Sequence, residues 1–296
     1  MAYITSSQVS CVIPHGGSAT YLKETVVSAV AQQFDEIILV NDGGPPAQLE
    51  DTVRLPGVRM IHLERSVGAA NARNVGIKAC KTPYVVLLDH DDVLCEGYLG
   101  AITAWVEKHQ LRCAAATMKY IGEYSGRVGV LVSRAPDFFL PSGFLSEISL
   151  IAEVGYFPDS ISEDILLFRE IRQVTKLTTC PDAQVLYRIH PQSGGSSNAK
   201  AWWACNRLLP LYHQGKLTLS EVNAIAREFA DNGTIPVGLE SQLRGEASAT
   251  ARLLSRSAYA CWLNRDLIGA ARYGVRLLGH VPKLGQLVRR KWTPGK

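Results

Sequence analysis

Short apolar runs alternate with helical patterns through the first part of the chain, and this alternation limits the fold classes open to it. Strands are expected at residues 9–14, 36–40, 58–63 and 84–88, because these runs have the length and β-branched content of buried strands. Helical patterns at residues 22–30 and 68–79 separate them. This order predicts an α/β fold, with a mostly parallel sheet flanked by helices.

Polar or glycine-rich loops follow three of the predicted strands. They are His-Gly-Gly-Ser at residues 15–18, Asn-Asp-Gly-Gly at residues 41–44 and Asp-His-Asp-Asp at residues 89–92. Ligands of open α/β sheets bind beyond the carboxyl ends of the strands. We therefore expect these three loops to converge on one cleft.

The third loop places three carboxylates, Asp89, Asp91 and Asp92, at the end of one strand. Crowded carboxylates stay ionised at low cost only when a cation lies among them. Oxygen ligands suit a hard divalent ion such as Mg²⁺ or Mn²⁺, and such ions usually also bind substrate phosphates. A solvated turn that caps the following helix is the alternative, and this segment alone does not decide between the two.

The remaining sequence changes in character near residue 200. A helix is expected at residues 97–109, strands within 113–134, helical structure from 146 to about 172, and a strand at 183–189 with a flexible loop at 190–198. Beyond residue 199 the sequence is rich in Ala, Leu and Arg in helical patterns. We therefore expect one domain over residues 1–200 and a helical extension over residues 201–296.

The composition indicates a globular, intracellular protein. A chain of 296 residues with 47% apolar content can form one large domain and a smaller one. Its seven cysteines include no Cys-x-x-Cys pair and are odd in number, so we expect reduced thiols in a cytoplasmic protein. No apolar stretch reaches the roughly 18 residues that span a bilayer, and the N-terminus lacks the layout of a signal peptide.

The net charge of +4 conceals a basic C-terminal segment, with seven basic residues and no acidic one after Asp266. Apolar residues interleave with them over residues 267–296, as in a helix that lies on an anionic membrane surface. A helix packed on the rest of the protein, with a solvated basic face, is the alternative. Pro282 and several glycines interrupt the pattern and favour the alternative. No nucleic-acid-binding module is recognisable.

Five motifs in a fixed order give the chain a family resemblance. They are Val-Asn-Asp-Gly at 40–43, Val-Gly-x-x-x-Ala-Arg-Asn-x-Gly-Ile at 67–77, Leu-Leu-Asp-x-Asp-Asp at 87–92, Glu-Asp at 163–164 and Tyr-Arg-Ile-His-Pro at 187–191. Together they resemble the family 2 glycosyltransferases of the GT-A fold, from about Val9 to Ser197. The resemblance implies a bacterial enzyme of surface-glycan synthesis with a Rossmann-like nucleotide-binding sheet.

The resemblance assigns six residues to the nucleotide-sugar donor, and two of them, Asp89 and His190, are also candidate metal ligands. Asp42 would contact the nucleotide base or the ribose, and Arg73 would lie by the nucleotide and its diphosphate. The planar guanidinium of an arginine also suits phosphate on chemical grounds. Pro14 and Glu163 would belong to the same nucleotide-sugar site.

The resemblance also assigns a metal site and a catalytic base. Asp91 would bind Mn²⁺ or Mg²⁺, and Asp89 would hold the ribose or complete the metal shell. His190 would reach the metal or the diphosphate from the loop that closes over the donor. Asp164 would be the catalytic base. Without the resemblance, Glu163 and Asp164 read more simply as acids at the positive end of a helix, and His190 as a surface residue.

The implied reaction moves a sugar from a nucleotide donor, expected to be UDP-linked, to a hydroxyl of a glycan or lipid-linked glycan. One carboxylate base acting opposite the leaving group gives inversion at the anomeric carbon. The extension would contact the acceptor, a membrane or a second subunit. Two alternatives stay open, a sugar nucleotidyltransferase and a catalytically inactive nucleotide-binding scaffold. The first usually has a basic glycine-rich loop after the first strand, and this chain has no Lys or Arg between Pro14 and Tyr21.

The chain departs from the family pattern at the first loop. The first strand usually ends Pro-Thr-Tyr-Asn, whereas this chain has Pro14-His15-Gly16-Gly17. The aromatic residue near the base is therefore missing, which leaves the identity of the nucleotide open.

Overall fold

In the computed structural model the described residues are 4–124, 127–128, 140–190 and 199–232. The chain divides into two compact units, the first of Met1–Asp159 and Glu163–Ile189, the second of Ser160–Ser162 and His190–Lys296. The basic segment 267–296 and the loop 191–198 lie outside the described residues. The predicted domain boundary at residue 200 and the membrane contact therefore stay predictions.

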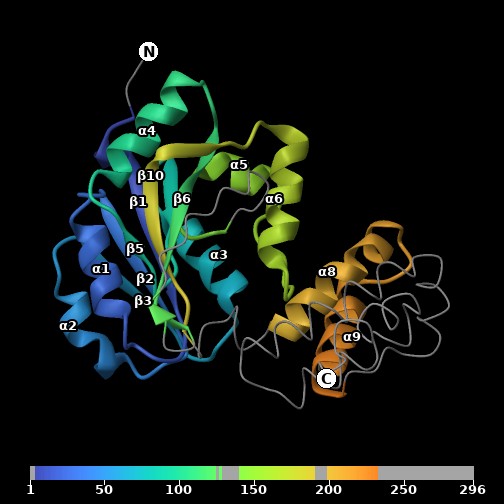
Figure 1. Ribbon diagram of the computed structural model, residues 1–296. Helices are drawn as coiled ribbons and strands as arrows, with labels where there is room; N and C mark the ends of the chain where they lie inside the picture. Colours follow the sequence, from blue (N-terminus) through green and yellow to red (C-terminus); the bar gives the residue numbers. More distant parts are fainter. Residues whose placement is uncertain (1–3, 125–126, 129–139, 191–198, 233–296) are drawn as a thin grey trace, which may run out of the picture. The chain divides into compact units, whose positions relative to one another are not determined.

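The described part of the first unit is built on an eight-stranded sheet in the order β3-β2-β1-β4-β9-β6-β10-β5 (Figure 1). The strands are β1 Val9–His15, β2 Glu36–Asp42, β3 Val58–Leu63, β4 Tyr84–Leu87, β5 Val93–Leu94, β6 Cys113–Ile121, β9 Phe144–Glu147 and β10 Thr179–Arg188. A separate two-stranded ribbon consists of β7 Glu123–Tyr124 and β8 Arg127–Val128.

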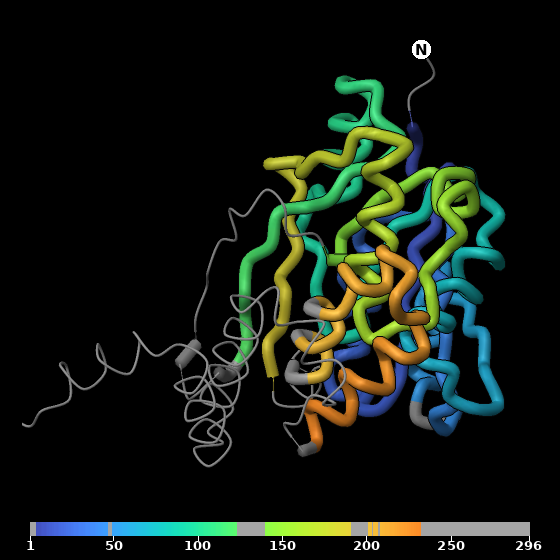
Figure 2. Tube along the Cα trace, turned by 90° about the vertical axis from the view of Figure 1, so that its right-hand side faces the viewer, coloured from blue at the N-terminus to red at the C-terminus, as the bar shows by residue number. Residues whose placement is uncertain are grey.

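The sheet is mixed but mostly parallel, which confirms the predicted fold class. Strands β1 to β4 pair in parallel, and so do β6 and β10, which run as long neighbours in Figure 2. Strand β9 lies between β4 and β6 and is antiparallel to both. Strand β5 pairs antiparallel with β10.

Helices cover both faces of this sheet (Figure 1). Alternate residues of β1 show the division, because Cys11 and Ile13 belong to one buried cluster and Val12 to the other. Helices α1 (Leu22–Val30) and α4 (Tyr98–Lys108) pack in the first cluster. Helices α3 (Ala69–Ala79), α5 (Ile148–Glu153) and α6 (Glu163–Val174) pack in the second. A strand buried on both faces reads as a continuous apolar run, as seen in the sequence.

The predicted strands and helices of the first hundred residues are confirmed, but residues 146–172 do not form one helical stretch. Helix α5 ends at Glu153, and α6 begins only at Glu163. Between them Gly155 and Tyr156 have positive φ angles of 88° and 65°, which an α-helix does not contain. Strand β9 was not predicted, because its four residues are too few for a periodic pattern.

Helix α3 approaches the sheet closely at Gly76. A Cβ atom at this position would overlap the side chains of Val12 and Val40. Its neighbour Ala72 is fully buried. The small residues in this motif therefore set the distance between α3 and the sheet, and so the position of Arg73.

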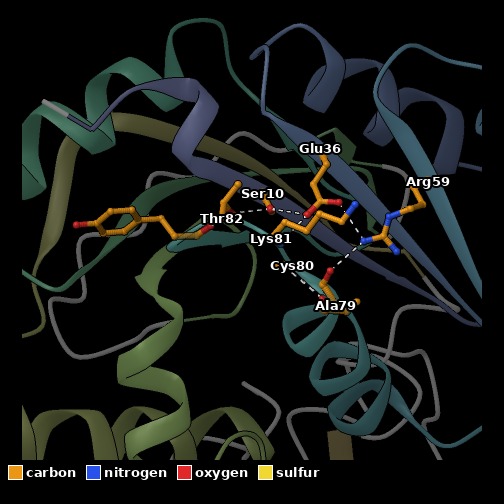
Figure 3. Close-up of polar contacts among 9 residues, drawn as sticks. Ser10, Glu36, Arg59, Ala79, Cys80, Lys81 and Thr82 are labelled. Carbon is orange, nitrogen blue, oxygen red and sulfur yellow. Dashed lines mark hydrogen bonds and ion pairs between the residues drawn. The ribbon is translucent and has the colours of Figure 1, made fainter.

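A polar network ties the strands together at the opposite, amino-terminal edge of the sheet (Figure 3). The Glu36 carboxylate accepts hydrogen bonds from Ser10 Oγ (3.1 Å), Lys81 N (3.0 Å) and Arg59 (3.0 Å). Ser10 also bonds Thr82 across 2.7 Å. Burial alone would raise the pKa of Glu36, but these hydrogen bonds and the Arg59 charge lower it below its ordinary value. The network therefore stabilises the ionised form of Glu36.

We expect Glu36→Gln to lower the free energy of unfolding at pH 7 by about 1.5–3 kcal/mol, the usual contribution of a hydrogen bond to a charged group. Because the folded-state pKa of Glu36 is lowered, this contribution is present above the unfolded-state pKa and is lost as the pH falls through the folded-state value. The difference between the two proteins should therefore shrink below about pH 4.5. Urea unfolding at several pH values measures it, with exposed Glu96→Gln as the control.

In the second unit the described residues include two helices, α8 (Ala199–His213) and α9 (Leu219–Asn232). Helix α9 begins with a reciprocal cap, in which Thr218 N donates to Glu221 Oε2 (2.7 Å) and Glu221 N to Thr218 Oγ1 (3.2 Å). None of the helices among the described residues is long and apolar enough to cross a membrane.

Candidate active site

The three polar loops come together at the carboxyl ends of β1, β2 and β4, as predicted. The ring of His15, at the end of β1, lies 5.1 Å from the ring of His90 in the acidic turn. A Cβ atom at Gly16 would lie 3.9 Å from the side chain of Asp42, at the end of β2. The three loops therefore form one cluster of polar groups.

The Asp42 carboxylate holds the segment that leads into α3. It accepts hydrogen bonds from Ser66 Oγ (2.8 Å), Val67 N (2.6 Å) and Gly68 N (3.0 Å). A carboxylate at the start of a helix also interacts favourably with its positive end. Asp42 is 8% exposed. Its predicted contact with the nucleotide stays a prediction.

Gly43 makes this arrangement possible. Its φ angle is 81°, and a Cβ atom there would meet the backbone of Arg65 and Ser66. Only glycine fits such a position without strain. The turn residues Asp42 and Gly43 thus have a structural role in addition to any contact with a ligand.

The acidic turn is anchored by Arg188, at the end of β10. The backbone N–H of Arg188 donates to Asp92 Oδ1 (2.8 Å). The side-chain Nε of Arg188 donates to the backbone carbonyl of Asp91 (2.8 Å). Its guanidinium also pairs with Glu24 of α1 at 2.7 Å. Arg188 belongs to the Tyr-Arg-Ile-His-Pro motif, but the sequence did not predict its contact with the acidic turn.

The turn concentrates negative charge in a buried place. Asp92 is fully buried, and its Oδ2 has no hydrogen-bond partner among the described residues. Burial, and next the charges of Asp91 and Asp89, raise the pKa of Asp92 well above its ordinary value. The structure therefore has the local repulsion between carboxylates that a cation would relieve.

Arg73 connects the acidic turn to the start of α6. Its guanidinium donates to Asp89 Oδ1 (2.6 Å) and to Glu163 Oε1 (3.0 Å), and it lies 5.4 Å from the ring centre of Phe157. Arg73 is 5% exposed. Burial alone would lower the pKa of Arg73, but the charges of Asp89 and Glu163 outweigh burial and raise it. Arg73 thus holds the acidic turn and the start of α6 together.

Asp164 follows Glu163 in the first turn of α6. It is 8% exposed, and its Oδ1 accepts a hydrogen bond from Ile165 N at 2.8 Å. An acid in the first turn is favoured by the helix dipole, so the structural interpretation and a catalytic role are compatible. The Glu163–Arg73 pair shows that the first turn of α6 lies at the acidic turn.

His15 belongs to the first of the predicted loops, but no role for its side chain was predicted from the sequence. It is 3% exposed, and its Nδ1 has no hydrogen-bond partner among the described residues. Burial, and in second place the charge of His90, lower the pKa of His15 to about 4. The imidazole is therefore neutral near pH 7.

The predicted site residues fall into three groups. Arg73, Asp89 and Glu163 are in direct contact. Pro14 pairs with Val40 near the ends of β1 and β2, and Asp42 is the last residue of β2. Asp91 lies in the acidic turn, and Asp164 follows Glu163 in α6. His190 is the first residue of the second unit's main segment, so its predicted role stays a prediction. Ser142, whose Oγ accepts from Asp89 N at 3.3 Å, carried no signal in the sequence.

The donor set fits a divalent cation of the Mg²⁺ or Mn²⁺ type. Among the described residues, no three or more His, Cys, Asp or Glu side chains form a group that could hold a metal by themselves. Mg²⁺, however, is usually bound by one or two carboxylates together with water and substrate phosphates. Asp89 and Asp91 can supply such a pair.

Solved structures with the same fold include TarS of S. aureus. The crystal structure of its residues 1–349 in complex with UDP-GlcNAc superposes with a TM-score of 0.57 and 17% identity, over 90% of this chain and 89% of TarS 1–349. The structure of the same TarS segment without that ligand gives a TM-score of 0.53. This likeness confirms the GT-A type of α/β fold.

Part of the sequence matches a known family. Residues 10–140 match the model of Glycosyl transferase family 2, as the motifs predicted. Relatives include glycosyltransferase GlyG of Streptococcus pneumoniae serotype 4, 32% identical over 35% of this chain and 36% of GlyG. The uncharacterized glycosyltransferase EpsJ of Bacillus subtilis is 33% identical over 35% of this chain and 31% of EpsJ. The matched part spans about a third of these relatives.

Proposed function

We propose that this protein is an inverting glycosyltransferase that moves a hexosyl or N-acetylhexosaminyl group from a UDP-sugar to a hydroxyl of a glycan or lipid-linked glycan. The observation that carries the proposal is the double ion pair of Arg73, which joins Asp89 of the acidic turn to Glu163 beside Asp164. A donor turn and a base must lie close together in such a reaction. The TarS complex with UDP-GlcNAc supports the choice of donor.

The residues divide the chemistry between them. Asp89 and Asp91 would hold Mn²⁺ or Mg²⁺, which neutralises the negative charge that gathers on the departing diphosphate. Asp164 would accept the proton of the attacking hydroxyl, a step that typically contributes ~10²–10⁴-fold. The acid pair at 163–164 thus has two roles, since Glu163 binds Arg73 and leaves the base role to Asp164. His190 would complete the donor site from the segment after β10.

The identity of the nucleotide is tested by measuring the thermal stability of the purified protein with each of a panel of nucleoside diphosphates and nucleotide-sugars, with and without Mn²⁺. A ligand at 100 times its dissociation constant adds about 2.7 kcal/mol to the stability. We expect a metal-dependent shift for UDP and UDP-sugars. No shift with any nucleotide, in folded protein, would contradict the proposed donor site and favour a scaffold without catalysis.

We expect Asp91→Ala to abolish the metal-dependent part of this shift. The substitution removes the carboxylate but keeps the backbone carbonyl that binds Arg188, so the turn should stay in place. Exposed Asp182→Ala is the matched control and should keep the full shift. A normal Mn²⁺-dependent shift in Asp91→Ala would show that the metal is held elsewhere.

A further inference from the structure

The segment that leads to the acid pair is held at three points. At its start, Asn74 of α3 bonds both backbone groups of Phe157, at 2.8 Å and 3.0 Å. At its end, Arg73 of the same helix binds Glu163. Between these points Ser160–Ser162 belong to the second unit. The hydrogen bonds that this stretch makes to α9 therefore lie within the second unit.

Asn223 of α9 makes this middle contact. Its Oδ1 accepts hydrogen bonds from Ile161 N (3.1 Å) and Ser160 Oγ (3.2 Å). Because a backbone N–H can only donate, the amide oxygen of Asn223 must face it. Ser160 Oγ in turn accepts from Ser162 N at 3.2 Å. This chain of hydrogen bonds ends at the residue directly before Glu163.

Burial makes these hydrogen bonds costly to lose. Asn223 is 8% exposed and Ser162 is fully buried. Cys205 of α8 packs beside them, with its Sγ 3.7 Å from Ser160 Oγ. A buried polar group without its partner is strongly unfavourable, so the backbone of residues 160–162 would move if the oxygen of Asn223 were removed.

We propose that Asn223 is a positioning residue for sugar transfer. Helix α9 would fix residues 160–162 and, through the chain, the point at which α6 begins and carries Asp164 into the site. The inference rests on the proposed role of Asp164 as the base. Catalytic geometry is sensitive to such support, because a misplacement of about 1 Å can cost ~10²-fold in rate.

The test compares Asn223→Leu, which removes the oxygen, with Asn223→Asp, which keeps an oxygen that accepts both hydrogen bonds. We expect the first to lower kcat at least about tenfold with an unchanged donor KM, and the second to restore most of kcat. Arg227→Gln, at an exposed position of the same helix, is the control. Equal kcat in Asn223→Leu and in the control would overturn the proposal, as would a loss in Asn223→Asp as large as in Asn223→Leu.

Hydrogen exchange gives a readout that does not depend on activity. The amides of Ile161 and Ser162 should exchange faster in Asn223→Leu, while those of the strands near Arg73 do not change. If the amides of Ile161 and Ser162 exchange in Asn223→Leu at the wild-type rate, the positioning role is overturned, whatever the activity of the variant. An inactive wild-type protein would instead contradict the proposed function. If Asn223→Leu does not fold, Ser160→Ala replaces it, because this change deletes one donor to Asn223 and the acceptor of Ser162 N.

Discussion

Replacing Asp164 by asparagine is expected to lower the rate of sugar transfer by about 10²- to 10⁴-fold while donor binding is kept. Asparagine has nearly the same shape and keeps an oxygen that can accept the hydrogen bond from Ile165 N, so α6 should begin at the same place. It cannot accept the proton of the acceptor hydroxyl at neutral pH. Initial rates of transfer and calorimetric titration with the UDP-sugar measure the two effects separately.

Exposed Glu170 of the same helix provides the control, and Glu170→Gln should transfer sugar at the normal rate. Full activity of Asp164→Asn would show that another group takes the proton. A loss of donor affinity equal to the loss in rate would place Asp164 in the donor site instead of at the acceptor.

Replacing Arg73 by methionine is expected to lower the free energy of unfolding by about 3 kcal/mol, at the low end for one partner of a buried ion pair. The side chain of Arg73 is 7% exposed, and its partners Asp89 and Glu163 are 22% and 18% exposed. The variant would leave two carboxylates unpaired and close together. Urea unfolding monitored by circular dichroism measures the change.

The free energy of unfolding of Arg73→Lys should lie between those of the wild type and Arg73→Met. A lysine ammonium keeps the charge but lacks the planar fork that spans both carboxylates. Lys78→Met is the matched control, since Lys78 lies on the same helix in an exposed position and contacts the ring of Tyr156 at 4.6 Å. We expect its loss to stay below about 1 kcal/mol. A loss in Arg73→Met no larger than in this control would show that the double ion pair adds no stability.

The sequence predicted the strands around the site well because they are buried on both faces. Residues 37–40 and 84–88 read as continuous apolar runs, and the polar loops that follow them mark the carboxyl edge of the sheet. The meeting of His15, Asp42 and His90 followed from this topology alone.

The contacts between the site residues could not be predicted from the sequence. Arg73 was predicted to lie by the diphosphate, yet nothing in its local pattern indicated Glu163, which is far away in the chain. The hydrogen bonds of Asn223 and Ser142 are equally distant in sequence from their partners. Such contacts depend on how elements pack, and single-sequence periodicity carries no information on packing.

The antiparallel strand β9 has a consequence for how sequences with this fold can diversify. Strand β6 ends at Ile121, and β9 begins at Phe144 opposite Leu87, next to the acidic turn. The connection between these two strands therefore starts and ends at the sheet, and it ends beside the acidic turn. For an unstructured loop, doubling the length costs only about 0.6 kcal/mol. A longer or exchanged connection between β6 and β9 would therefore leave the strands that hold the carboxylates undisturbed.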